Sequence, residues 1–146
     1  MAKTGNRSDP FTAFRFEVSI DAIAVAGFSD CTGLRLETPM MSYAEGGVNT
    51  FQHQLPMPSK QANLVLKRGI VDRLLWNWHW DLVQGRAYPK SGSIKVFDGA
   101  SDNPSMHWEF REALPTIWDG PALSATQSAV ALESLTLVHH GLERVV

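Results

Sequence analysis

Five histidines are the side chains of this sequence best suited to binding a metal or moving a proton, so their spacing comes first. His139 and His140 are neighbours in a predicted strand, where adjacent side chains point to opposite faces and cannot readily hold one ion. His79 falls in a predicted helix with no His or Glu three or four residues away, so the helical metal-binding pair is missing. We therefore expect surface or interface histidines and no metal site.

The search for a nucleophile gives a similar answer. Cys31 follows Asp30 in a turn-like stretch and has no neighbouring cation that would lower its pKa, which favours an unreactive thiol. No serine occurs in a nucleophile-elbow pattern, and Gly46-Gly47 matches neither a phosphate-binding loop nor a dinucleotide fingerprint. The sequence thus predicts neither enzyme activity nor a cofactor.

Length and charge narrow the class of protein further. A chain of 146 residues is the size of one domain, so we expect a single domain over residues 1–146. Cys31 is the only cysteine, which rules out an intramolecular disulfide and suits synthesis in a reducing cytoplasm. With 13 Lys and Arg against 15 Asp and Glu, the formal charge of -2 offers no basic surface for nucleic acid. Residues 1–10 are polar, which predicts a flexible N-terminal segment and neither a signal peptide nor a membrane anchor.

Strand signals dominate the elements that must position these residues. Apolar and polar residues alternate over 14–21, which predicts a first strand. The apolar segment 23–28 and the alternation over 34–37 predict a second and a third strand that follow closely, so the first strands of the chain are expected to be antiparallel. Further strands are expected at 63–67, 94–97 and 106–111. With a last run near the C-terminus, this gives six or seven strands. The expected fold is mainly β, a small antiparallel β-sandwich or barrel with one flanking α-helix.

The last run changes phase. Val130 and Leu132 are in one phase, whereas Leu135 and Leu137 are in the other. This pattern predicts either a β-bulge near Glu133 or Ser134 or a strand that is buried on both faces.

Helical periodicity appears once, over residues 72–83, with Gly85 as the stop signal. The expected core stripe consists of Leu74, Leu75, Trp78 and Leu82. Trp76 and Trp80 lie one turn apart on a different face. Either the helix is buried on two sides within its own subunit, or this second face meets another chain, because tryptophan is enriched at interface hot spots.

Residues 45–59 are irregular, with two glycines and two prolines, and too long for a tight turn. We expect an extended arm there, or else an ordinary mobile surface loop. Gly46 and Gly47 permit backbone conformations closed to other residues, and Pro56 and Pro58 stiffen the segment.

Several short motifs occur in a fixed order along the chain. They are Asp9-Pro10-Phe11, Tyr43-Ala44-Glu45-Gly46-Gly47-Val48-Asn49, Leu55-Pro56, Lys60, Leu64-Val65-Leu66-Lys67-Arg68-Gly69 before the Trp-rich helix, Leu114-Pro115, Gly120-Pro121, and Ala131-Leu132-Glu133-Ser134-Leu135 before His140-Gly141. Together they resemble the tail tube family of contractile phages, which includes the inner-tube proteins of extracellular contractile injection systems. Met57 is a departure, since family members often carry glycine after the Leu-Pro.

The resemblance implies that six copies pair strands side by side into a continuous barrel around a lumen, and that the rings stack through long loops. Closing a ring also covers exposed strand edges. On this basis the candidates for contacts between subunits or rings are Glu45, Gly46, Gly47, Asn49, Leu55, Pro56 and Lys60 in the arm, and Trp76 and Trp80 on the helix.

The implied function is structural: a rigid inner tube, driven through a target envelope by a contracting sheath, that conducts cargo. The implied partners are copies of the chain itself, a sheath protein, baseplate proteins, a cap or terminator, and cargo in the lumen, within a particle assembled in the cytoplasm. Three alternatives stay open: a monomeric β-barrel that binds a small apolar ligand, a hydrolase whose site is built from distant residues, and a baseplate-proximal tube initiator of the same family.

Overall fold

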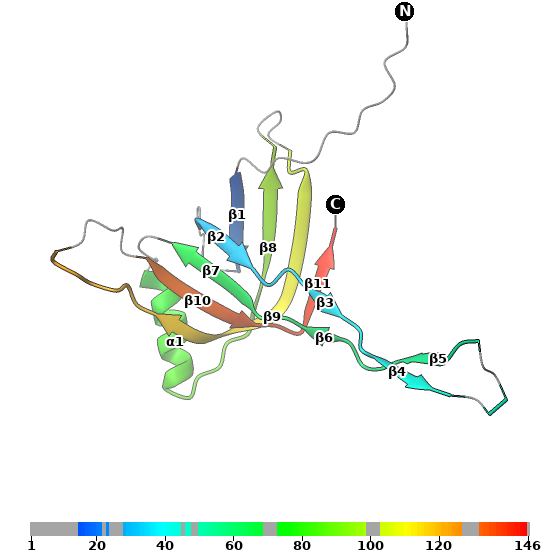
Figure 1. Cartoon of the computed structure of the whole chain (residues 1–146). Coiled ribbons are helices and arrows are strands. Elements are labelled where there is room, and N and C mark those ends of the chain that lie inside the picture. Colours follow the sequence, from blue (N-terminus) through cyan, green and yellow to red (C-terminus); the bar gives the residue numbers. More distant parts are fainter. Residues whose placement is uncertain are drawn as a thin grey trace, which may run out of the picture.

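The computed structural model describes residues 15–21, 23, 28–44, 46–47, 50–68, 73–98, 103–126 and 132–145. These residues form a curled seven-stranded sheet, one helix, and a two-stranded arm that projects from the sheet (Figure 1). The elements are β1 Arg15–Ile20, β2 Asp30–Thr32, β3 Leu36–Glu37, β4 Met40–Tyr43, β5 His53–Pro56, β6 Lys60–Gln61, β7 Leu64–Arg68, α1 Arg73–Val83, β8 Lys90–Phe97, β9 Met106–Asp119, β10 Glu133–Val138 and β11 Gly141–Arg144.

The mainly β fold with one helix is confirmed, but the described residues hold more strands than the expected six or seven. The strands that were not expected are β2, β4, β5, β6 and β11, and each has only two to four residues. Strands of that length are too short to show a period of two in the sequence.

Strand β9 joins the two halves of the sheet. Its first half pairs with β8 and β11, and its second half pairs with β10. At the junction Glu112 has a φ of 49°, and the register with β8 shifts between Lys90 and Gly92. Such a bulge bends a strand, so the halves β1-β8-β9-β11 and β9-β10-β7-β2 curl around one core (Figure 1).

The core between the two halves is built from side chains of several strands and the helix. Phe110, Leu64, Leu66, Leu75, Leu135 and Leu137 are fully buried. Gly92 of β8 lies beneath the Phe110 ring, and a Cβ atom added there would meet that ring and the backbone oxygen of Ser19. Glycine is therefore required at this point of close approach.

The first strands of the chain do not pair with each other. β1 pairs with β8 and β2 pairs with β7, at opposite ends of the strand order. The expectation that the first strands of the chain form an antiparallel group is therefore wrong. Alternation determines which residues of a strand face the core, but it does not determine the partner strand. Ile23 is buried and bridges Ile20, whereas residues 24–27 lie outside the described part of the chain.

The phase change near the C-terminus corresponds to a strand buried on both faces, one of the two alternatives. Leu135, Thr136 and Leu137 of β10 are all buried. The irregularity in register lies between Thr136 and Leu137, opposite Pro115 and Ile117 of β9, and not at the expected bulge position near Glu133 or Ser134. Proline cannot donate a backbone hydrogen bond, so a place beside such an irregularity suits Pro115.

Helix α1 confirms the predicted helix, although residue 72 lies outside the described residues. The backbone N–H groups of Gly85 and Arg86 donate to the Leu82 and Asp81 carbonyls at 3.0 and 2.8 Å, and Gly85 has a φ of 87°. This is a Schellman ending, in which glycine adopts the left-handed conformation at little cost. No helix within the described residues is long and apolar enough to cross a membrane.

The core stripe of α1 is narrower than expected. Leu75 and Trp78 are buried, and the Trp78 indole N–H donates to the Tyr88 carbonyl at 2.8 Å. Leu74 is 50% exposed, so its assignment to the core was wrong. Adjacent residues on a helix point about 100° apart, and the stripe is centred on Leu75 and Trp78.

Candidate assembly surfaces

The two-stranded arm, residues 36–61, stands outside the main sheet (Figure 1). β3 pairs with β6 and β4 pairs with β5, and the Met57 backbone N–H donates to the Pro39 carbonyl at 2.7 Å between the two ladders. The sequence predicted an arm only from residue 45 to 59. The structure extends it to a hairpin whose strands begin at Leu36 and end at Gln61, which we call the hairpin arm.

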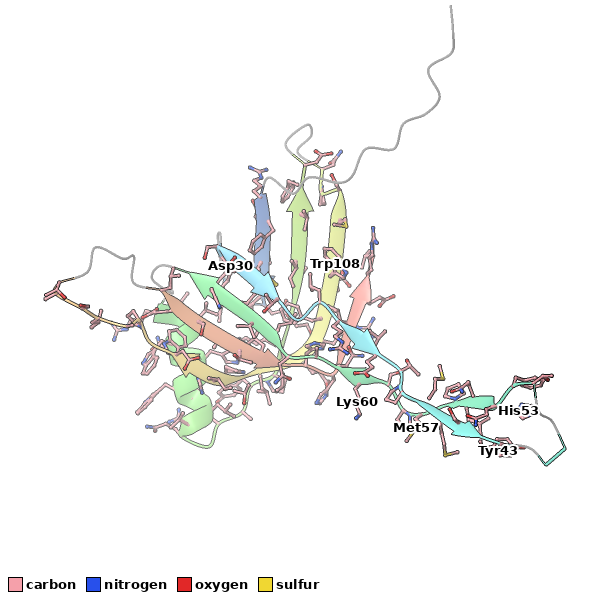
Figure 2. The ribbon with its side chains drawn as sticks, viewed as in Figure 1. Asp30, Tyr43, His53, Met57, Lys60 and Trp108 are labelled. Atoms are coloured by element: carbon pink, nitrogen blue, oxygen red, sulfur yellow. The ribbon has the colours of Figure 1, made fainter. Side chains whose placement is uncertain are left out.

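The hairpin arm has two different faces near its tip. On one face the Tyr43 and His53 rings stack at 5.4 Å, and the Phe51 ring meets His53 edge-on at 5.2 Å. Met41 and Leu55 are cross-strand partners two residues from Tyr43 and His53, and therefore lie on the same face. We call Met41, Tyr43, Phe51, His53 and Leu55 the apolar face; Figure 2 labels Tyr43 and His53 there.

The opposite face of the hairpin arm is polar at its centre. The Ser42 hydroxyl and the Gln54 side-chain amide are joined by two contacts, in which Ser42 donates at 3.0 Å and Gln54 donates at 2.8 Å. Met40 and Pro56, the cross-strand pair two residues along, also lie on this face, so it is polar only at its centre. A ribbon with an exposed apolar face is suited to lying on another surface.

The apolar side chains of the hairpin arm are not covered by the described part of the chain. Their exposed fractions run from 44% at Leu55 to 59% at Phe51, and Leu36, Met40 and Met57 are exposed to a similar degree. An isolated two-stranded hairpin is marginally stable in water. Contact with another surface would stabilise this one.

Most of the arm candidates from the sequence lie on the hairpin arm. Gly46 and Gly47 form part of the turn at the tip, Leu55 and Pro56 belong to β5, and Lys60 belongs to β6 (Figure 2). Gly47 has a φ of 93°, a conformation that favours glycine. Glu45 and Asn49 lie outside the described residues.

Sequence reasoning missed much of the apolar face. Met41, Tyr43, Phe51 and His53 were not among the candidates. A signal was present, because Phe51, His53, Leu55 and Met57 alternate with Gln52 and Gln54. The glycines and prolines around this run obscured it.

A second exposed surface lies on α1. Trp76 and Trp80 are 44% and 48% exposed, which argues against a helix buried on both sides. The two rings stack at 6.1 Å, and Trp76 meets Trp118 of β9 edge-on at 5.1 Å. In Figure 1 the hairpin arm projects away from α1, so the candidates fall on two separate surfaces.

The histidines and the cysteine have structural surroundings. His139 is buried, with Nε2 3.0 Å from the Ala62 carbonyl, so placing it on the surface or at an interface was wrong. His139 and His140 follow β10 instead of lying within it, and the exposed His140 has Nδ1 2.7 Å from Glu112. Cys31 lies in β2, not in a turn, and burial raises its pKa to about 11, which keeps the thiol protonated. The described residues contain no group of three potential metal ligands.

Several solved structures have a similar fold. A chain of the PVC sheath–tube complex of an extracellular contractile injection system is 23% identical, with a TM-score of 0.81 over 92% of this chain and 90% of that chain. A chain of the anti-feeding prophage cap is 21% identical, with a TM-score of 0.84 over 99% of this chain and 98% of that one. Hcp1 from Flavobacterium johnsoniae is 10% identical, with a TM-score of 0.57 over 90% of this chain and 95% of that chain.

No curated protein sequence matches the chain. The family model of the T4-like virus tail tube protein gp19 matches residues 12–143, which is nearly the whole chain. This chain therefore belongs to the T4-like tail tube protein family.

Proposed function

We propose that the chain is the structural subunit of the inner tube of a contractile injection system or phage tail. Six copies form a ring, and the rings stack into a hollow conduit for cargo. The observation that carries this proposal is the hairpin arm, a projecting ribbon whose apolar face finds no cover in the described part of its own chain. Family membership gives the context in which copies of the chain supply that cover.

The hairpin arm is suited to contacts between copies. Complete burial of a Leu, Met or Phe side chain contributes about 1.5–3 kcal/mol. Met41, Phe51 and Leu55 are 49%, 59% and 44% exposed in the single chain, so roughly half of this burial free energy is still to be gained at each of them. Burying this face against a neighbour would stabilise both the hairpin and the junction. Gly46, Gly47, Pro56 and Lys60, with Glu45 and Asn49, remain candidates for the same contact.

The number of copies and the other partners are proposed from the solved relatives. One relative belongs to an anti-feeding prophage baseplate determined with six-fold symmetry, and others belong to a sheath–tube complex and a cap. For this chain we propose a hexamer that binds sheath, baseplate and cap or terminator proteins and holds cargo in its lumen. The particle is assembled in the cytoplasm and acts as a passive conduit without catalytic activity.

A monomer with an interior ligand site is less compatible with the core. Phe110, Leu64 and Leu137 fill the space between the two halves of the sheet. A hollow of about 870 Å³ beside Gly92 opens at the surface and is lined partly by Asp21, Glu109 and Arg111, which does not suit an apolar ligand.

Electron microscopy of the purified full chain over a range of concentrations tests the proposal. We expect rings of six copies, and stacked tubes at higher concentration. Rings that never stack would favour the tube initiator of the same family. A chain that remains monomeric at every concentration would refute the proposal.

A further inference from the structure

The hairpin arm continues the β2–β7 pair of the main sheet. β2 pairs with β7 and β3 pairs with β6 in one register, with three residues on each strand between the two ladders. The arm is therefore the same two-stranded ribbon, extended past the main sheet (Figure 1). The third strand does not follow it, because β10 pairs with β7 only as far as Leu64, opposite Leu137. Beyond that point the ribbon has two strands, and such a ribbon is marginally stable in water.

The regular ladder is interrupted at the root of the hairpin arm, which we define as residues 33–35 and 62–64. Gly33 has a φ of 96°, and a Cβ atom added there would meet the Asn63 carbonyl. The Ala62 N–H donates to the Arg35 carbonyl at 3.3 Å, but the Arg35 N–H donates to the Gly33 carbonyl at 2.7 Å. In a hydrogen-bonded antiparallel pair the Arg35 N–H would instead donate to the Ala62 carbonyl. The Ala62 carbonyl is therefore left for another donor.

The side chain of His139 is that donor. Its Nε2 lies 3.0 Å from the Ala62 carbonyl oxygen, and the residue is buried. Since Leu137 of β10 pairs with Leu64 of β7, extending this register by two residues places His139 opposite Ala62. His139 follows β10 and is not part of the strand. Its ring thus supplies a hydrogen bond to the ribbon just beyond the end of the third strand.

The backbone on both sides of His139 is held by β9. Val138 pairs with Leu114, and the His140 N–H donates to the Arg111 carbonyl at 2.9 Å. These two contacts flank the bend of β9, where the two halves of the sheet meet. The His139 ring therefore ties the root of the hairpin arm to the junction between the two half-sheets.

The chemistry of this bond determines which ring nitrogen carries the proton. A carbonyl oxygen only accepts, so Nε2 of His139 must donate, and in a neutral ring Nδ1 is then an acceptor. Nδ1 is buried and has no hydrogen-bond partner in the described part of the chain. Apolar burial contributes little at the root, because Leu34 and Leu36 are 37% and 58% exposed. The Nε2 bond is therefore well placed to hold the root.

We propose that His139 is a positioning residue, whose Nε2–H bond to the Ala62 carbonyl fixes the direction of the hairpin arm relative to the core. The consequence for assembly rests on the proposed function. An arm held in one direction presents its apolar face to a second copy with little further loss of conformational entropy. An arm that moves freely at its root must be ordered when two copies meet, and this weakens their association.

Three substitutions of His139 separate the hydrogen bond from the volume of the ring. His139→Gln keeps a donor with a similar reach, because the side-chain nitrogen of glutamine can take the place of Nε2. His139→Asn carries the same amide on a side chain that is one methylene shorter, so its nitrogen does not reach the Ala62 carbonyl. His139→Met keeps a long side chain and has no donor. The Gln variant is the matched control for the other two.

Hydrogen exchange of the Ala62 amide measures how often the root opens, and NMR resolves it in the full chain at concentrations where sedimentation shows single copies. Leaving the Ala62 carbonyl without its donor should make this amide exchange roughly tenfold faster in the Asn and Met variants. The Gln variant should exchange as the wild type does. The Leu66 amide, in the core part of β7, is the internal control, and the increase at Ala62 should exceed any increase there. Sedimentation velocity at higher concentration should show weaker association for the Asn and Met variants only.

Equal exchange at Ala62 in all four chains overturns the proposal, and so does a Gln variant that exchanges as the Asn and Met variants do. The wild-type chain gives a test that depends on no variant: nitrogen NMR of the imidazole should find the His139 proton on Nε2, and a proton on Nδ1 alone rules the bond out.

The association data separate this proposal from the proposed function. If exchange differs but all four chains associate equally, the bond has no positioning role in assembly and the proposal is overturned, while the proposed function stands. Absence of rings from the wild-type chain refutes the proposed function. The exchange rates then still decide whether His139 fixes the arm.

Discussion

Replacing Met41 and Leu55 by serine tests whether the apolar face of the hairpin arm joins copies of the chain. The two residues are cross-strand partners at the centre of that face, 49% and 44% exposed. Since complete burial of such a side chain contributes about 1.5–3 kcal/mol, each has roughly 1 kcal/mol still to gain on association. The double variant should therefore lose about 2 kcal/mol per arm, roughly a 30-fold weaker association constant.

The stability of the subunit should change far less. The exposed cross-strand pair contributes roughly 0.2–1 kcal/mol to its own hairpin, and the hairpin arm lies outside the core. Sedimentation velocity over a concentration series measures the association, and urea unfolding followed by tryptophan fluorescence measures the subunit. All five tryptophans lie outside residues 36–61, so the fluorescence reports on the body of the protein.

The matched control changes the polar face of the same strands. Ser42→Thr with Gln54→Thr replaces the hydrogen-bonded pair by good strand formers and leaves the apolar face unchanged. It should associate as the wild type does. If the serine variant shifts the association midpoint by no more than this control, the apolar face does not carry the contact and the reasoning fails.

Three further predictions concern other residues. Trp80→Ala removes a side chain that is 48% exposed, so we expect a clear loss of rings on micrographs and little change in the urea midpoint of the subunit. A urea midpoint that falls in proportion to the ring yield would show that Trp80 acts only within its own subunit. Gly47→Glu strains a residue with φ of 93° at the tip and should lower tube yield with normal subunit unfolding, whereas Gly46→Glu should have a smaller effect because Gly46 has no positive φ. Burial raises the pKa of Cys31 from 9.0 to about 11, so the folded chain holds a proton that the unfolded chain loses. Stability is unaffected below pH 9.0 and falls between pH 9.0 and about 11, by up to about 1.4 kcal/mol per pH unit, and urea titrations should find this decline missing from Cys31→Ser.

Local patterns in the sequence predicted local structure well. The alternation from Phe16 to Ile20 is strand β1, with Val18 and Ile20 in the core. The periodic run before Gly85 is α1, and Gly85 ends it through the Schellman bonds. In each case the relevant interactions are made within the segment or by one face of it, so composition and period suffice.

The same patterns could not predict which strands pair with each other. Nothing in the alternation of β1 selects β8 as its partner, because any antiparallel neighbour buries the same face. The bend of β9 depends on Glu112 at a φ of 49°, and glutamate carries no turn signal. For the candidate surfaces, Trp76 and Trp80 could be identified because their helical face differs from that of Leu75. Trp118 could not, since its contact with Trp76 is tertiary.

The edges of the main sheet differ in how readily they would accept another strand. β1 and β11 carry Arg15, Glu17, Glu143 and Arg144, and such charges oppose indiscriminate strand pairing. Residues 114–119 of β9, which pair only with β10, carry a single charge, at Asp119, and Trp118 there meets Trp76 edge-on. We therefore expect strand pairing between copies to be less favourable at β1 and β11 than at residues 114–119 of β9. If the hairpin arm and the Trp76–Trp80 surface form separate contacts, substitutions at Trp80 and at Leu55 should have additive effects on the free energy of assembly.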